Sequence, residues 1–238
     1  MWWLVVRRCS ALAVRCCAGA RLVGRRGAGV VPVRCMNGWV EVREVVGMSE
    51  ALLLPPHDAW TLADLDRVPD DGCRYEIFDG SLLVSPPPSV RHQAVAQVLS
   101  RLLEAAAGAN VRVLQAAGIA TSGEDEALKY VIPDVLVVSA QAVRGDVRAL
   151  DPRDVLAVIE IVSPSTVTRD QVLKRAVYAG LGIGSYWLVG TTGQGSITVL
   201  ELDAAAGLYR EVQVAVGSHT VRVARPFAVE VSPSALVS

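Results

Sequence analysis

Two long runs of apolar residues, 131–139 and 155–163, constrain the fold more than any other feature of this 238-residue sequence. They are rich in Val, Ile and Leu, and their apolar residues are too continuous for strands that face water on one side. Runs of this kind are typical of strands covered on both faces, so they favour a sheet that lies between layers of helices. With 52% hydrophobic and 20% charged residues, the chain can build such a core.

Helices and a hairpin are expected around these runs. The clearest helix is predicted over residues 89–108, where apolar residues recur at helical spacing between Val95 and Leu103, with Ser89 as the cap and Gly108 as the stop. Shorter helices are predicted over 60–68 and 168–179. Asp79-Gly80 supplies the positive φ angles of a two-residue turn, which predicts a hairpin of strands 75–78 and 81–84.

Further strands follow at 111–114 and 186–189, and the alternating segments beyond residue 190 predict antiparallel strands at 197–202, 209–216 and 220–223. Strands covered on both faces, with helices before and between them, predict an α/β or α+β domain. We therefore expect a mixed central sheet flanked by helices, with an antiparallel appendage at the C-terminus.

Residues 1–47 differ from the rest of the chain in charge. They hold eight Arg against Glu41 and Glu44, a balance of +6, so the remainder carries −7 within a total of −1. An Arg-rich export or organelle-targeting segment and a basic nucleic-acid-binding arm are two interpretations. The interpretation that we favour is that translation begins at Met48. In that case 1–47 is a disordered or mis-assigned extension, and 48–238 is a single domain.

Cysteine and hydropathy indicate the compartment. Four of the five cysteines lie in residues 1–47, and Cys73 alone lies beyond them, so no disulfide framework is expected. The long charge-free run 176–200 is interrupted by Gly, Ser, Thr and Gln, which argues against a transmembrane helix. We therefore expect a cytoplasmic protein with no membrane partner.

Two carboxylates stand inside the apolar runs. Asp134 follows Pro133 at the start of Val-Leu-Val-Val, and Glu160 is embedded in Val-Leu-Ala-Val-Ile-Glu-Ile-Val. Each has a purely structural explanation, because Asp134 could cap a turn and Glu160 could pair with a core arginine. Burying an ionised carboxylate without a partner costs several kcal/mol, however. Neighbouring strands place side chains about 5 Å apart, so the pair could share one divalent ion.

The order of several short motifs resembles the Uma-type endonuclease family, which belongs to the PD-(D/E)xK restriction-endonuclease-like superfamily. The resemblance covers roughly residues 58–235. Its motifs are Tyr75-Glu76-Ile-Phe-Asp79-Gly80, Ser89-Val-Arg-His92-Gln93, Pro133-Asp134-Val, Glu160-Ile-Val-Ser163-Pro164-Ser165-Thr166, Arg169-Asp170, Lys174, Tyr178 and Tyr186-Trp187-Leu188-Val189.

The resemblance implies a restriction-endonuclease-like fold and a metal-dependent endonuclease that hydrolyses phosphodiester bonds in DNA. Asp134 and Glu160, with the backbone carbonyl of Ile161, would hold Mg²⁺ or Mn²⁺. The superfamily pattern expects Lys two residues after the Glu, but Val162 stands there. In Uma-type sequences the lysine has moved to the following helix, which nominates Lys174 as a catalytic residue.

Three of the candidate site residues, Lys174, Glu76 and His92, each have an alternative, purely structural explanation. Lys174 is spaced i, i+4 from Asp170, as in an ordinary helix-surface ion pair. Glu76 matches the family's early acidic position and would be a third carboxylate at the site, or an edge-strand residue that faces solvent. His92 could point from the start of the long helix toward the sheet and act in catalysis, or belong only to the capping turn.

The charge of residues 48–238 leaves a second function open. A body carrying −7 should repel DNA unless several arginines form a basic patch, so the chain could be a nuclease scaffold without activity that serves as a binding or regulatory module. The arginines in question are Arg91, Arg101, Arg144, Arg148, Arg153, Arg169 and Arg175. Cutting both strands of a duplex usually calls for two active sites, so a homodimer is a further expectation.

Overall fold

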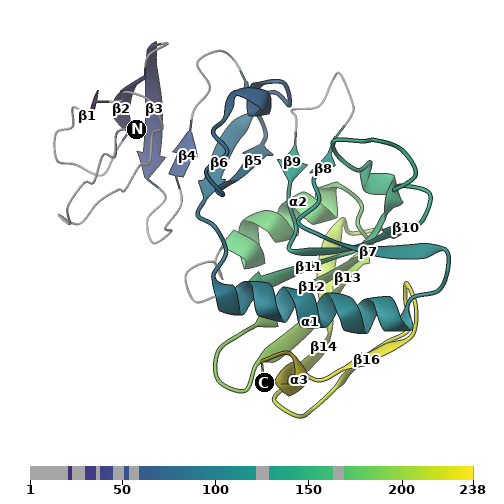
Figure 1. Ribbon diagram of the computed structural model, residues 1–238. Helices are drawn as coiled ribbons and strands as arrows, with labels where there is room; N and C mark the ends of the chain where they lie inside the picture. The colour runs from purple at the N-terminus through teal and green to yellow at the C-terminus, as the bar shows by residue number, and fades with distance from the viewer. Residues whose placement is uncertain are drawn as a thin grey trace. The chain divides into compact units, whose positions relative to one another are not determined.

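The structure, a computed structural model, describes residues 59–121, 129–162 and 169–237, together with the backbone of four strands nearer the N-terminus (Figure 1). Side chains are not described in those four strands or at residues 169–171. The chain divides into two compact units. The first comprises Met1–Pro87 with Ser122–Val131, and the second comprises Pro88–Thr121 with Ile132–Ser238.

Four strands of the first unit pair in antiparallel order: β1 (Arg21–Leu22), β2 (Val30–Cys35), β3 (Gly38–Glu44) and β4 (Ala51–Leu53). Most of residues 1–58 lie outside the described residues. The expected extension over 1–47 and the expected single domain over 48–238 therefore both stay predictions.

The predicted hairpin is confirmed in the first unit. Strands β5 (Arg74–Phe78) and β6 (Ser81–Ser85) pair antiparallel, and the turn between them places Asp79 at φ 46° and Gly80 at φ 77°. On its other side β5 pairs with β9 (Tyr130–Val131). The helix expected over 60–68 is a shorter 3-10 helix, Asp64–Arg67, next to a small core of Leu65, Ile77 and Leu82.

A six-stranded mixed sheet forms the centre of the second unit, in the order β14-β13-β12-β11-β10-β7. Only β11 and β12 run parallel, and every other neighbouring pair is antiparallel. The strands are β7 (Val111–Gln115), β10 (Val135–Ser139), β11 (Val155–Val162), β12 (Ser185–Gly190), β13 (Ser196–Asp203) and β14 (Leu208–Val216).

The structure differs from the predicted strands in two respects: where one strand begins, and to which sheet the C-terminal strands belong. The run 131–139 is divided between β9 and β10, because Pro133 has no N–H for a ladder and Asp134 forms a bend. The antiparallel C-terminal strands are confirmed, but β13 and β14 belong to the central sheet. Of the described C-terminal strands, β15 (Val221–Val223) and β16 (Val229–Val231) form a separate pair. A further short strand, β8 (Ile119–Ala120), precedes residues 122–128.

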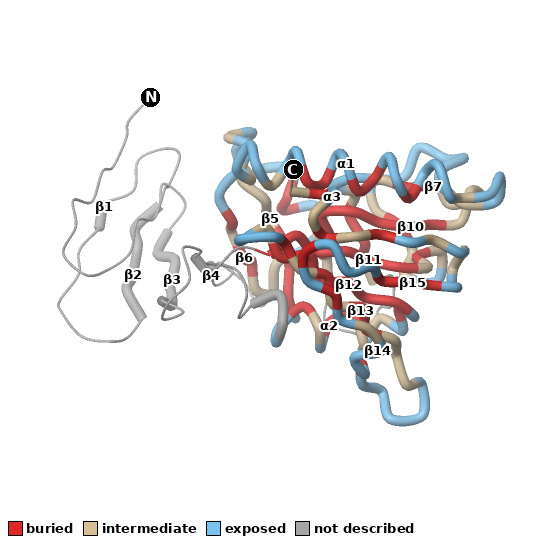
Figure 2. The backbone as a smooth tube through the Cα atoms, turned by 90° about the horizontal axis from the view of Figure 1, so that it is seen from below, coloured by how far each residue is buried: buried red, intermediate tan, exposed pale blue. Residues whose placement is uncertain are grey.

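Helices cover both faces of this sheet, which confirms the mixed sheet flanked by helices. On one face lies α1 (Val90–Ala106), whose side chains at Val95, Leu99 and Leu103 pack into one core with Val135 and Ile159. The short α3 (Pro233–Val237) joins this core through Leu236. Figure 2 shows the contrast between the exposed outer side of α1 and the buried central strands.

The other face is covered by α2 (Arg175–Gly180), which continues a π-helix, Arg169–Lys174. Its Tyr178 packs edge-on against Tyr186 of β12, with ring centroids 5.2 Å apart. The ends of β10 and β11 thus lie between α1 and α2 (Figure 1).

Within the described part of the chain, no helix is both long enough and apolar enough to cross a membrane.

Candidate active site

Asp134 lies in the bend that leads into β10, just beyond the register pair Val135 and Ile159. Its Oδ2 accepts a hydrogen bond of 2.7 Å from the backbone N–H of Ile161 in β11. The carboxylate therefore serves as the acceptor for an N–H of β11 where the β10 ladder has ended. Its side chain is 3% exposed, so this hydrogen bond offsets part of the cost of burial.

His92 reaches the same carboxylate from the first turn of α1. Ser89 caps the helix, because its Oγ accepts from the backbone N–H of His92 at 3.2 Å. The imidazole Nε2 lies 2.9 Å from Oδ2 of Asp134. An ionised carboxylate only accepts, so Nε2 carries the proton in this pair. The capping turn and the inward ring, proposed as alternatives for His92, are therefore both present in the structure.

The other ring nitrogen of His92, Nδ1, is buried and has no hydrogen-bond partner among the described residues. In a neutral imidazole that donates from Nε2, Nδ1 is an acceptor.

Glu160 points away from the α1 core. Its neighbours Ile159 and Ile161 belong to that core, and successive side chains of a strand alternate between faces. Its Oε1 accepts two hydrogen bonds, at 2.8 Å from Nζ of Lys174 and at 2.5 Å from the hydroxyl of Tyr178. The side chains of Glu160 and Lys174 are each 1% exposed, so this is a buried ion pair.

Lys174 stands at the end of the π-helix, four residues before Tyr178 on the turn that faces the sheet. Lys174 is buried, so it does not lie on the helix surface as that alternative assumed, and its pairing with Asp170 is not tested. The side chain of Asp170, its suggested partner, lies outside the described residues. The structure places Nζ of Lys174 2.8 Å from Oε1 of Glu160, and the predicted catalytic role of Lys174 stays a prediction.

Glu76 belongs to the first unit, in β5. Its side chain is 1% exposed, and β5 has β6 on one side and β9 on the other. The alternative that Glu76 is a solvent-facing residue of an edge strand is therefore wrong. Its predicted role as a third carboxylate stays a prediction.

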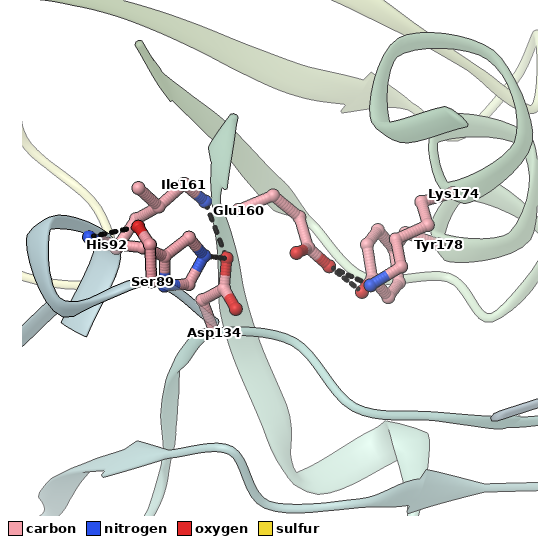
Figure 3. A network of polar contacts seen from close by, with 7 residues as sticks. All are labelled: Ser89, His92, Asp134, Glu160, Ile161, Lys174 and Tyr178. Carbon is pink, nitrogen blue, oxygen red and sulfur yellow. Dashed lines mark hydrogen bonds and ion pairs between the residues drawn. The ribbon is translucent and has the colours of Figure 1, made fainter. Parts of the chain in front are cut away.

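The predicted site residues of the second unit form two networks (Figure 3). One joins His92, Asp134 and the backbone of Ile161, and the other joins Glu160, Lys174 and Tyr178. Glu160 turns toward Lys174 and Tyr178, away from Asp134. The prediction that the two carboxylates hold one ion stays a prediction. The ligand role of the Ile161 carbonyl also stays a prediction. The contact between Ile161 and Asp134 in the structure is made by the backbone N–H of Ile161.

Tyr178 is among the motifs of the sequence, but no role was predicted for it, although its hydroxyl contacts the central carboxylate. The i, i+4 spacing from Lys174 was the available signal. It indicated a shared helix face, but it did not indicate that this face is turned toward Glu160.

The donor set limits the kind of metal that could bind. No group of three or more His, Cys, Asp or Glu side chains within 59–121, 129–162 and 172–237 is placed to hold a metal ion. A closed protein cage is therefore not supported there. Two buried carboxylates with hard oxygen donors fit Mg²⁺, which is usually bound through one or two carboxylates together with water and substrate phosphates.

Two of the arginines considered for a basic patch have partners of their own. Arg153 hydrogen-bonds Asp151, and this interaction lowers the pKa of Asp151 to about 2. Arg175 donates to the backbone carbonyl of Tyr209 at 2.7 Å. Of the other arginines in the set, Arg91 and Arg101 are exposed on α1, and Arg144 and Arg148 are exposed in the segment after β10.

The chain is similar to known proteins in sequence and in fold. The family model Uma2, described as "Putative restriction endonuclease", matches residues 62–236. A crystal structure from Anabaena variabilis, described as a "putative nuclease belonging to DUF820", is similar with a TM-score of 0.57 at 18% identity. That match covers 75% of this chain and 97% of the other. At this identity the likeness concerns the fold. No curated protein matches the chain.

Proposed function

The chain belongs to the Uma2 family of restriction-endonuclease-like proteins, and from this premise we propose that it is a metal-dependent endonuclease that hydrolyses phosphodiester bonds in DNA. One observation carries the proposal beyond the family. Two buried carboxylates lie beside each other on neighbouring strands, Asp134 just before β10 and Glu160 near the end of β11, and each accepts a hydrogen bond from a different helix. Buried ionisable clusters of this kind are typical of functional sites.

Asp134 and Glu160 are the residues that would hold Mg²⁺ or Mn²⁺, with the backbone carbonyl of Ile161 as a further oxygen donor. When bound, such an ion polarises the scissile phosphate and lowers the pKa of an attacking water. The chain's own part is to keep hard oxygen donors ionised inside an apolar framework. The hydrogen bonds from Ile161 and His92 to Asp134, and from Lys174 to Glu160, favour the ionised form of each carboxylate.

Lys174 has a second role in this proposal. Its ammonium is a compact charge that lies beside Glu160. As a positive charge at the site, it would orient the attacking water or stabilise the negative charge that develops on the phosphate. His92 would act by holding Asp134 in place, and Glu76 is proposed as a supporting carboxylate.

A binding or regulatory module on the same fold is the second candidate. The charge of −7 over residues 48–238 favours it, because binding to a polyanion gains from basic surface. A titration of the full chain with Mg²⁺ or Mn²⁺ discriminates between the two. Metal binding that is lost in Asp134→Ala and Glu160→Ala supports the endonuclease, whereas no measurable binding by the intact protein favours the module.

The decisive assay measures cleavage of plasmid and single-stranded DNA by the full chain with Mg²⁺ or Mn²⁺. Glu160→Gln is expected to lower the rate by about 100-fold or more, the order found when one stabilising group of an active site is removed. Glu104→Gln is the matched control, because Glu104 lies exposed on α1. Equal cleavage by wild type and Glu160→Gln would mean a contaminating nuclease and would end the proposal.

A further inference from the structure

We infer that Tyr178 is a positioning residue for the metal site, acting through Glu160. The inference rests on the proposed function and deepens it. The hydroxyl of Tyr178 donates to Oε1 of Glu160 at 2.5 Å, the same oxygen that accepts from Lys174 at 2.8 Å. Tyr178 is 0% exposed, and a hydroxyl at this depth needs a partner.

The two donors constrain Glu160 in different ways. Lys174 carries its charge on a flexible four-carbon stem, and the attraction between two charges has little directional preference. Tyr178 has a rigid ring with two side-chain torsions, and its O–H bond is directional. The ammonium therefore supplies charge, while the hydroxyl determines how the carboxylate is turned.

The ring of Tyr178 is itself held in place by a row of tyrosines. It packs edge-on against Tyr186 at 5.2 Å, and Tyr186 packs against Tyr209 at 5.6 Å. The hydroxyl of Tyr209 in turn donates to the backbone carbonyl of Ile183 at 2.5 Å. The position of the Tyr178 ring is thus determined by ring packing on α2, β12 and β14, and this packing does not depend on the Tyr209 hydroxyl, which bonds Ile183 instead.

Groups that orient a metal ligand from behind usually change metal affinity by about 10- to 100-fold when they are removed. Loss of the Tyr178 hydroxyl would leave the Glu160–Lys174 charge pair in place and release only the orientation of the carboxylate. The expected consequence is weaker metal binding and a lower kcat, without a change in KM for DNA, because Tyr178 is buried behind Glu160.

The test compares Tyr178→Phe with Tyr209→Phe in the full chain. Both variants lose one buried hydroxyl bond of the same length and keep the ring, but only Tyr178 bonds Glu160. The Kd for Mn²⁺ is measured by calorimetry without DNA, kcat and KM are measured on plasmid DNA, and thermal unfolding is followed by circular dichroism.

A Kd for Mn²⁺ that weakens by about 10-fold or more in Tyr178→Phe and by less than about 2-fold in Tyr209→Phe supports the inference. An unchanged or tighter Kd in Tyr178→Phe overturns it, and so does equal weakening in both variants. If the wild type cuts DNA and binds Mn²⁺ while Tyr178→Phe behaves identically, the inference fails alone. If the wild type does neither, the proposed function fails and the role of Tyr178 fails with it.

Discussion

Replacing Lys174 by methionine should destabilise the fold strongly, although Lys174 is the last residue of the π-helix. The substitution keeps an unbranched side chain, one atom shorter than lysine, and removes its charge. At 2.8 Å and an effective dielectric constant of about 20, the attraction between Lys174 and Glu160 amounts to about 6 kcal/mol before desolvation is subtracted. Removal of one partner from a buried pair typically costs about 3–5 kcal/mol, because the other charge is left uncompensated.

The Tyr178 hydroxyl still donates to Glu160 in this variant, so we expect a loss near the lower end of that range, about 3 kcal/mol. The double variant Lys174→Met/Glu160→Gln should lose less than Lys174→Met alone, because both the attraction and the desolvation penalty are then absent. Urea unfolding of the full chain, followed by circular dichroism, gives the free energy of unfolding of the wild type, both single variants and the double variant.

Two results would refute this reasoning. A loss below about 1 kcal/mol in Lys174→Met would be the value of an exposed ion pair and would contradict the burial of Lys174. Strict additivity of the two single substitutions would mean that Lys174 and Glu160 do not interact in the folded state.

Further predictions concern a cap, a turn and alkaline pH. Ser89→Ala should lower the free energy of unfolding by about 1 kcal/mol, because the capping bond to His92 is lost, and urea unfolding measures it. Gly80→Ala should cost at least about 1 kcal/mol at φ 77°, where a new Cβ would lie 2.7 Å from the Cβ of Ala59; thermal unfolding should show a lower Tm than wild type. Burial raises the pKa of Tyr209, so the unfolded chain loses this proton first and stability should fall as pH rises above about 10. Unfolding free energies measured between pH 8 and 11 should show a smaller fall in Tyr209→Phe.

Local pattern was sufficient for much of the fold. Asp79-Gly80 predicted a hairpin that the structure confirms, because a two-residue turn depends on the φ angles of those two residues. Ser89 predicted the start of α1 for the same kind of reason, since a capping bond spans three residues. The place of β13 and β14 in the central sheet was not predictable, because strand pairing over long separations leaves no local signal.

Part of the candidate site could likewise be predicted from local pattern, and part could not. That Asp134 and Glu160 are buried carboxylates in need of partners followed from the sequence alone, since a charged residue inside an apolar run must be compensated. The identity of the partners did not follow. His92 is 42 residues from Asp134, and Tyr178 is 18 residues from Glu160.

The sequence by itself therefore determined the turns, the helix caps and the alternation of strands, because each of these depends on residues that are neighbours along the chain. The choice of partners belongs to the packed molecule. Only the placement of α1 on one face of the sheet and α2 on the other brings His92 to Asp134 and Lys174 with Tyr178 to Glu160. A helix face has no preferred partner until the sheet beneath it has formed.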